Sequence, residues 1–265
     1  MGVSLRISTP FAIAALTALV LWGPVSGYAD GPAYTCRENA KLARLSAPLI
    51  RMQRLVASGR SVAIMALGSS STAGAGASAP TATYPARLEV ELRARFPGVG
   101  ITVINRGVNG EEAADMLARF DQVAAADKPD VVLWQVGTNA VLRDNPLDPV
   151  DRRLQDGLAR MKVLGADVVL IDPQFAPKVI VKPEAEDMVG VIAAEATKRG
   201  VDLFPRFAVM RDWHEAQAIP FEAFLSPDLL HMNDWGYACL AKLLGAAMAD
   251  AATRPVASAG VTTPK

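Results

Sequence analysis

Five short apolar runs, rich in valine and isoleucine, recur along the chain with amphipathic segments between them. Apolar residues are continuous within each run rather than alternating, which is typical of strands covered on both faces. The runs occupy residues 61–68, 101–107, 130–139, 166–174 and 201–207. The pattern therefore predicts five buried strands.

The segments between these runs carry apolar residues at helical spacing. One stripe recurs every four residues from Tyr84 to Phe96 and ends at a Pro-Gly pair. Further stripes run over residues 116–123 and 154–164. We interpret residues 36–58 as a helix that leads into the first strand, and residues 233–252 as the closing helix.

Strands and helices that alternate with short connections predict parallel strands joined by right-handed crossovers. Helices then cover both faces, so the expected fold class is α/β, a three-layer α/β/α sandwich around a five-stranded parallel sheet. No internal repeat, long linker or change in composition divides residues 60–250. We expect one domain over residues 30–255, followed by a flexible tail at residues 256–265.

The N-terminus has the features of an export signal. Arg6 precedes an uncharged run over residues 11–22, and small residues follow as far as Ala29. The run is shorter than the roughly 20 residues that a membrane-spanning helix needs. We therefore interpret residues 1–29 as a cleaved signal peptide rather than a membrane anchor. The mature protein is expected to be periplasmic or extracellular, without a stable membrane span.

Export would place the two cysteines, Cys36 and Cys239, in an oxidising compartment. A disulfide between them would tie the start of the mature chain to its last helix. The alternative is two buried thiols that do not meet, because a pair of cysteines alone does not establish proximity. The sequence leaves both open.

The charge of the chain is balanced, with 27 Lys and Arg residues against 27 Asp and Glu residues. No basic excess is available to bind phosphates, so nucleic acid is a poor candidate partner. Two histidines and two distant cysteines provide no metal-ligand spacing, so neither a metal nor a cofactor is expected. Nothing in the sequence specifies an oligomeric state.

Ligands of parallel α/β sheets bind outside the carboxyl ends of the strands. The residues that follow each predicted strand are therefore the candidates for chemistry. Ser70 stands two residues after the first run, among small residues. A serine placed there can present its hydroxyl and its backbone N–H to the same space, which suits a nucleophile.

Other uses of the glycine-rich stretch that follows compete with this interpretation. A phosphate-binding loop would need a Lys-Ser or Lys-Thr pair after the glycines, and none is present. A lipase-type elbow would need glycine where Thr72 stands. A dinucleotide fingerprint is formally met by Gly74, Gly76 and Ala79, but the stretch runs into Pro80 instead of opening a helix.

Asp228 and His231 form an Asp-x-x-His pair before the closing helix. A carboxylate at this spacing can accept the Nδ1 proton of the imidazole and leave Nε2 free to face a serine. The other histidine, His214, follows an acid by two residues but falls in a predicted helix, so His231 is favoured as the general base. The alternative for His231 alone is a capping or core histidine.

Acyl transfer also needs donors aimed at the developing oxyanion. Gly110 follows the second run, where a residue without a side chain lets its N–H approach a ligand, and Gly107 is a rival for this role. Asn139 ends the third run, and its carboxamide can donate, although a helix N-cap is the alternative. Serine, glycine, asparagine and Asp-x-x-His, in this order at one predicted edge, together indicate an acyl-transfer site.

This order resembles the SGNH hydrolase family, the GDSL-type esterases and lipases, over roughly residues 60–250. The matching blocks are GSSSTAG, NRGVNGEE, GTNA and DLLHMNDWGY. The resemblance implies a flavodoxin-like fold, with Ser70 as nucleophile, His231 as base and Asp228 as its orienting acid. It also implies an oxyanion hole made by the Ser70 N–H, the Gly110 N–H and the Asn139 side chain.

Two positions depart from the pattern that is common in this family. Ser69 stands where the first block usually has an aspartate, and Ala140 where the third block usually has one. The hydrogen bonds that those acids make are therefore expected to be missing or rearranged here. Neither position is a catalytic one.

The resemblance and the export signal together indicate a serine esterase that acts on carboxylic esters of a small molecule or a polysaccharide. The framing loops, residues 73–83, 140–150 and 172–187, lack the long apolar stretch expected of a lid over a fatty chain. This favours short acyl groups, such as O-acetyl on a carbohydrate. Loop residues that could contact a glycan are Phe175, Lys178, Lys182 and Arg143, although surface lysines are usually only solvated.

Several other functions stay open at this point. A lipase or thioesterase would act on longer acyl chains, and an O-acyltransferase would pass the acyl group to an alcohol. A glycan-binding relative without activity is motivated by the two absent aspartates. A dinucleotide oxidoreductase would use Gly74, Gly76 and Arg106 for a phosphate, but its glycine motif lacks the helix that should follow.

Overall fold

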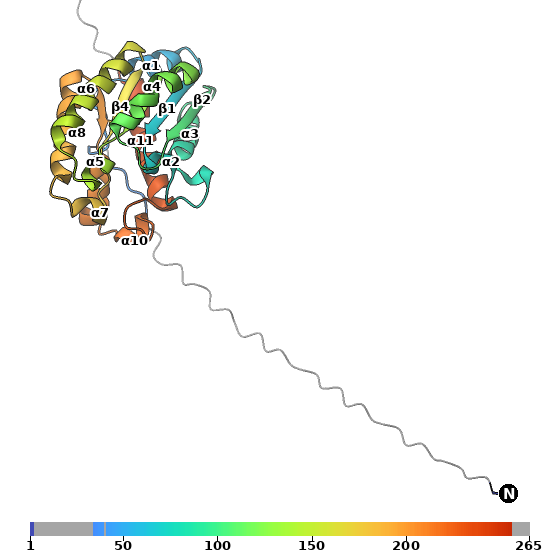
Figure 1. Cartoon of the computed structure of the whole chain (residues 1–265). Coiled ribbons are helices and arrows are strands. Elements are labelled where there is room, and N and C mark those ends of the chain that lie inside the picture. Colours follow the sequence, from blue (N-terminus) through green and yellow to red (C-terminus); the bar gives the residue numbers. More distant parts are fainter. Residues whose placement is uncertain (3–33, 40, 256–265) are drawn as a thin grey trace, which may run out of the picture. The chain divides into compact units, whose positions relative to one another are not determined.

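A computed structural model describes residues 1–2, 34–39 and 41–255 of the chain (Figure 1). Five parallel strands form one sheet in the order β2-β1-β3-β4-β5. The strands are β1 (Val62–Gly68), β2 (Ile101–Gly107), β3 (Val131–Gln135), β4 (Asp167–Ile171) and β5 (Asp202–Phe204). The predicted signal peptide beyond residue 2 and the predicted tail lie outside the described residues.

Helices cover both faces of the sheet, which confirms the predicted three-layer sandwich (Figure 1). One layer contains α1 (Ile50–Ala57), α3 (Tyr84–Arg95) and α11 (Asp234–Thr253). The other layer contains α4 (Ala113–Asp127), α6 (Leu147–Val163) and α8 (Ala185–Arg199). Short helical pieces in the connections are α2 (Ser70–Ala73), η1 (Pro80–Ala82), α5 (Thr138–Leu142), α7 (Pro177–Ile180), α9 (Arg206–Arg211), η2 (Asp212–Ala216) and α10 (Phe221–Phe224).

Burial of the strands follows their position in the sheet. Every residue of β3 is buried, and β1 is buried except at Ala63. The edge strand β2 is less covered, and its residues Thr102 and Asn105 are exposed. Continuous apolar character therefore predicted two-sided burial correctly for the central strands but not for β2.

The first helix is much shorter than predicted. Helix α1 occupies only Ile50–Ala57, whereas the pattern predicted a helix over residues 36–58. Pro48 disfavours a helical conformation in the residue before it and has no N–H to donate. The Ala47 N–H instead donates to the Asp202 carboxylate at 2.8 Å. A tertiary contact with the start of β5 thus replaces a helical hydrogen bond.

The third strand ends four residues before the predicted limit at residue 139. Gly137 has a positive φ of 98°, which turns the chain out of the sheet and into α5. A side chain there would also collide with α8, since an added Cβ would lie 2.9 Å from Ile192 Cδ1. As a result, Asn139 stands on a short helix at the sheet edge rather than on the strand.

Candidate active site

Four segments that are distant in the sequence meet at the carboxyl edge of the sheet. Ser70 is the first residue of α2, directly after β1, and Gly110 lies in the turn after β2. Asn139 is the second residue of α5, after β3. Asp228 and His231 lie in the loop that precedes α11. Parallel strands bring their carboxyl ends to one edge, and these residues therefore lie around one region.

A continuous hydrogen-bond chain joins the serine, the histidine and the aspartate. His231 Nε2 lies 2.8 Å from Ser70 Oγ, and His231 Nδ1 lies 2.5 Å from Asp228 Oδ2. The carboxylate can only accept, so Nδ1 carries the proton and Nε2 is left to accept from the Ser70 hydroxyl. This arrangement is suited to removing the Ser70 proton during attack on a carbonyl carbon.

The Asp228 carboxylate also holds its own loop in place. Its Oδ1 accepts hydrogen bonds from the Ser226 hydroxyl at 2.7 Å, the His231 N–H at 2.9 Å and the Leu230 N–H at 3.0 Å. Burial opposes the charged form, but the hydrogen bonds from His231, Ser226 and Leu230 outweigh burial and hold the pKa of Asp228 far below its usual value. The acid therefore stays ionised while it orients the imidazole.

The lowered pKa of Asp228 predicts a stability effect with a definite sign. Folding favours the ionised form, so its stabilising contribution is present above the unfolded pKa of about 3.9 and is lost as the pH falls through the folded pKa. Asp228→Asn is expected to melt below the wild type at pH 7 and to lose less further stability on acidification from pH 5 to 3. Melting curves across this range test the prediction, and parallel curves for the two proteins would contradict it.

Two backbone donors are available for an oxyanion. Among the described residues, neither the Ser70 N–H nor the Gly110 N–H has an intramolecular acceptor. Gly110 has a positive φ of 79°, and its carbonyl oxygen accepts from Arg143 Nη2 at 2.8 Å. That hydrogen bond holds the carbonyl of the peptide group between Gly110 and Glu111, directly after the Gly110 N–H.

The amide of Asn139 is oriented by the chain beside it. Its Nδ2 donates to the Glu111 carbonyl oxygen at 2.7 Å, which leaves the second N–H of the same group for a ligand. The Glu111 side chain forms a bidentate ion pair with Arg119, at 2.6 Å for the shortest contact. The acceptor for the Asn139 amide is thus itself held in place.

The structure separates the two favoured residues from their rivals. The Gly107 N–H donates to Asn105 Oδ1 at 2.9 Å, and the residue packs so closely on α2 that an added Cβ would lie 2.1 Å from the Ala73 nitrogen. His214 Nδ1 lies 3.0 Å from the Ile219 carbonyl oxygen, and its ring stacks on an aromatic neighbour. The Gly107 N–H and the His214 ring thus each have a partner other than Ser70.

A buried glutamine supports the Ser70 turn, and the sequence analysis did not identify it. Gln135 Oε1 accepts from the Ser69 N–H at 2.9 Å, the Ser69 hydroxyl at 3.1 Å and Thr72 Oγ1 at 3.2 Å. Thr72 in turn is hydrogen-bonded to Tyr84, where burial raises the pKa of the phenol to about 12. The serine at position 69 is therefore tied to β3 by neutral hydrogen bonds. A polar residue at the end of an otherwise apolar run was the signal that could have found Gln135.

The glycine-rich stretch after Ser70 lets two loops approach each other. Gly76 has a φ of 88°, and an added Cβ would lie 2.4 Å from the Met232 carbonyl oxygen and 3.1 Å from His231 Cβ. Nearby, the Tyr237 hydroxyl donates to the Ala75 carbonyl oxygen at 2.6 Å. The stretch therefore packs against the loop that carries the histidine, and it forms no helix that could receive a dinucleotide phosphate.

Gly76→Ala is expected to impair catalysis more than folding. The new Cβ would displace the loop of His231, and misplacement by about 1 Å lowers kcat by up to about 10²-fold, while the strain costs about 1–3 kcal/mol of stability. Gly59→Ala is the matched control, because φ is 65° there and nothing lies within 4 Å of the added atom. Steady-state kinetics and melting of both variants test this, and equal kcat values in the two would contradict it.

The peripheral residues suggested by the sequence are mostly engaged with protein. Phe175 is buried and packs edge-to-face on Phe207, so it does not face a ligand. Lys182 pairs with Asp144 at 2.7 Å, and Arg143 pairs with Glu112. Arg106, the phosphate partner of the oxidoreductase alternative, forms a bidentate pair with Asp127. These contacts weaken the anionic-glycan and dinucleotide interpretations.

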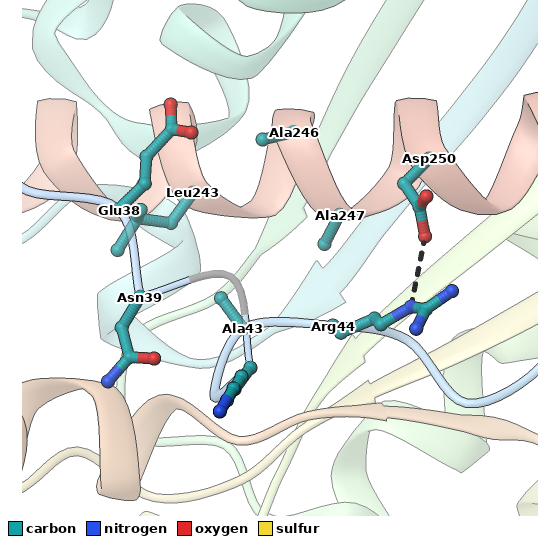
Figure 2. Close-up of a pocket in the computed structure, with 9 residues that line it drawn as sticks. Glu38, Asn39, Ala43, Arg44, Leu243, Ala246, Ala247 and Asp250 are labelled. Atoms are coloured by element: carbon teal, nitrogen blue, oxygen red, sulfur yellow. Dashed lines mark hydrogen bonds and ion pairs between the residues drawn. The ribbon is translucent and has the colours of Figure 1, made fainter.

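The chain entering the domain is fastened to the last helix. Cys36 and Cys239 form a disulfide with a Cα–Cα distance of 5.5 Å. Beside it, a hollow of about 450 Å³ lies between this segment and α11 (Figure 2). Its walls include Glu38, Asn39 and Arg44 on one side and Leu243, Ala246 and Asp250 on the other, with an Arg44–Asp250 ion pair at 3.4 Å. The hollow contains none of the predicted site residues.

No group of three or more His, Cys, Asp and Glu side chains in the described part of the chain is arranged to hold a metal ion. No described helix combines the length and the apolar character that a membrane span requires.

The fold and this edge define a flavodoxin-like α/β protein whose sheet presents a hydrogen-bonded serine, histidine and aspartate. The family model of the non-GDSL lipase-like family matches residues 35–254, and the chain belongs to this family. The predicted resemblance to SGNH hydrolases is thereby confirmed at the level of the wider group. The narrower expectation of a GDSL-type member is not confirmed, because the matching family is a non-GDSL one. Serine rather than aspartate at position 69 agrees with this.

Named relatives of the chain include esterases. An acetylxylan esterase of Geobacillus stearothermophilus is 32% identical over 94 residues, which are 32% of this chain and 43% of the relative. An arylesterase of Vibrio mimicus is 32% identical over 80 residues, 30% of this chain and 40% of the relative. The matched stretches thus span less than half the length of either relative.

Solved structures share the fold over more of the chain. The crystal structure of a two-domain esterase active on acetylated mannans superimposes with a TM-score of 0.67 at 20% sequence identity. The similarity covers 82% of this chain and 58% of that one. At this level of identity it establishes the shared fold.

Proposed function

We propose that the protein is an exported serine esterase that hydrolyses short acyl esters, foremost O-acetyl groups on a carbohydrate. The hydrogen-bond chain from Ser70 Oγ through His231 to Asp228 carries this proposal. Membership of a lipase-like family and relatives named as acetylxylan esterase and arylesterase support the reaction class.

The proposed reaction has two steps. His231 Nε2 takes the Ser70 proton as Oγ attacks the ester carbonyl carbon, and the resulting oxyanion is bound by the Ser70 N–H, the Gly110 N–H and the Asn139 amide. The protonated imidazole then gives its proton to the departing alcohol, which leaves an acyl-enzyme. Water, deprotonated by His231, attacks the acyl carbon and releases a carboxylic acid and free Ser70.

The surroundings of the site favour a small, uncharged ester as substrate. The framing loops contain no long apolar stretch, and their cationic side chains at positions 143 and 182 are already paired with carboxylates. An uncharged ester with a small acyl group fits such a site better than a fatty chain or a polyanion. A carbohydrate as the alcohol part is supported by the named relatives that act on acetylated polysaccharides.

Export is supported by two features that do not depend on the site. Residues 1–29 have the pattern of a signal peptide. The Cys36–Cys239 disulfide is of the kind that persists in the periplasm or outside the cell. Expression in a heterologous host, followed by N-terminal sequencing of the protein, tests export. Protein that stays in the cytoplasm and still begins at residue 1 would overturn it.

The central experiment is a substrate series with the mature protein. Hydrolysis of p-nitrophenyl esters from acetate to palmitate is measured first, followed by acetate release from acetylated mannan and acetylated xylan. We expect hydrolysis to fall steeply for acyl chains longer than butyrate, and acetate to be released from at least one of the two polysaccharides. A preference for palmitate would favour the lipase alternative. Acetyl transfer to an added sugar that outpaces release to water would favour a transferase.

Asn139→Ala is expected to lower kcat by about 10²–10³-fold, because one of three oxyanion donors is removed. KM should change little, since the donor acts mainly on the charge of the transition state. Asn145→Ala is the control, because it also removes an amide, one that donates to Glu112 Oε2 at 2.7 Å rather than into the site. Unchanged turnover in Asn139→Ala would remove this residue from the oxyanion hole.

A further inference from the structure

A second buried polar cluster lies beneath the candidate active site and takes no part in the hydrogen-bond chain of Ser70. It contains Thr138, Asp172, Gln174 and Arg206, all of them nearly or completely buried. Burial raises the pKa of Asp172 to about 7 and lowers the pKa of Arg206 to about 10, so the guanidinium is still charged at neutral pH. A buried cation is costly unless its hydrogen bonds are well used.

Gln174 is the centre of this cluster. Its Oε1 accepts from the Arg206 guanidinium Nη2 at 2.8 Å and from the Thr138 hydroxyl at 2.8 Å. Its Nε2 donates to the Leu230 carbonyl oxygen at 3.4 Å. Arg206 is itself held by donation from Nε to the Asp172 carbonyl oxygen at 2.9 Å.

The partners of Gln174 are the immediate neighbours of site residues. Thr138 precedes Asn139 on α5, and Leu230 precedes His231 in the loop before α11. A single side chain after β4 therefore contacts both the segment with the candidate oxyanion amide and the segment with the candidate base. The contact with Thr138 is an accepted hydrogen bond, and the contact with Leu230 is a donated one.

The charge of Arg206 decides which way the Gln174 amide points. An amide oxygen is attracted to a guanidinium, whereas an amide NH₂ placed there would meet another donor. With Oε1 held by Arg206 and Thr138, Nε2 must face the opposite side, where the Leu230 carbonyl oxygen lies. The buried Arg206 guanidinium thus sets the orientation of the Gln174 amide in addition to making its own hydrogen bonds.

We propose that Gln174, oriented by Arg206, is a positioning residue. It fixes the loop that carries His231 relative to the start of α5, which carries Asn139. The inference rests on the proposed esterase function and concerns the same site. It predicts that loss of the hydrogen bond from Gln174 Nε2 to Leu230 lowers kcat, even when the hydrogen bonds accepted by Oε1 are kept.

Gln174→Glu removes the donating NH₂ group of the amide but keeps its accepting oxygen. A glutamate keeps oxygen acceptors for Arg206 and Thr138, and its charge pairs with the guanidinium, but it turns a second oxygen toward the Leu230 carbonyl. We expect kcat for p-nitrophenyl acetate to fall about 10- to 100-fold, with KM within about twofold and the melting temperature within a few degrees of the wild type. kcat is read on the plateau of the pH–rate profile, so that a shifted pKa is not counted as lost positioning.

Gln53→Glu is the matched control. Gln53 lies on α1, and its Nε2 donates to the Arg254 carbonyl oxygen at 2.7 Å. The substitution therefore removes the same kind of hydrogen bond away from the candidate site. Thr138→Val is a second test, because it removes one accepted bond and leaves the donation to Leu230. It is expected to lower kcat by less than Gln174→Glu does.

The rate at which a fluorophosphonate labels Ser70 provides a readout that does not depend on the natural substrate. Slower labelling and lower kcat in Gln174→Glu, with Gln53→Glu like the wild type, would support the proposal. A Gln174→Glu variant with wild-type kcat and labelling would overturn it and leave the esterase function intact. A wild-type protein that neither hydrolyses an ester nor reacts with the probe would overturn both.

Discussion

Ser70→Ala is expected to reduce kcat for p-nitrophenyl acetate by about 10⁴–10⁶-fold, because it removes the atom that forms the acyl-enzyme. His231→Ala should cause a loss of similar size, since Ser70 Oγ has its only side-chain proton acceptor at His231 Nε2, 2.8 Å away, among the described residues. Groups that act as a unit are not additive, so the double variant should be no worse than either single one. Initial rates of the three proteins test this.

Ser71→Ala provides the matched control for Ser70→Ala. Ser71 is the next residue on α2, it is buried, and no hydrogen bond of its hydroxyl with another described side chain is present. It should retain most of the activity and react with a fluorophosphonate like the wild type. Equal losses in Ser70→Ala and Ser71→Ala would show that the substitutions act through folding. A loss in the Ser70→Ala/His231→Ala double variant that is much larger than in either single variant would contradict a shared mechanism.

Loss of the Cys36–Cys239 disulfide is expected to cause the largest change in stability. The bond closes a loop with a sequence separation of 203 residues. In the chain-entropy model such a loop contributes about 5 kcal/mol, which for a domain of this size corresponds to a fall of about 10–20 °C in melting temperature. Cys36→Ser with Cys239→Ser, or reduction of the wild type by dithiothreitol, should both produce this shift.

The same experiment contains its own control. The chain has two cysteines in total, so dithiothreitol should have no effect on the double-serine variant. Turnover at 25 °C should stay close to the wild-type value, because Cys239 lies on α11 and neither cysteine is hydrogen-bonded to Ser70 or His231 in the described part of the chain. Two titratable thiols in the native, oxidised protein would contradict the bond itself.

Much of the fold could be predicted because its signals are local. Continuous apolar runs at residues 61–68 and 130–139 predicted β1 and β3, the two strands with the most complete burial, although β3 ends at Gln135. The spacing of Leu154, Leu158 and Met161 predicted the buried face of α6. Parallel pairing then followed from the alternation of strands and helices.

The failures lie where a distant contact outweighed the local pattern. The sequence predicted a helix over residues 36–58, but α1 begins only at Ile50, because Pro48 and the hydrogen bond from Ala47 to Asp202 disfavour a helix just before it. Gln135 lies within the run predicted over residues 130–139 and was assigned no role there, although it supports the Ser70 turn through three hydrogen bonds. Gln174 and Arg206 gave no sequence signal, because each has meaning only through partners far along the chain.

By itself, the sequence determined the α/β class, the edge of the sheet where chemistry is expected, and a short set of candidates at that edge, because strand ends and motif spacing are local properties. The tertiary structure placed His231 rather than His214 beside Ser70 Oγ, engaged the Gly107 N–H with Asn105, and revealed the two buried glutamines. The physical reason is that hydrogen bonds of about 3 Å depend on the folded path of several segments at once, which no single stretch of sequence specifies.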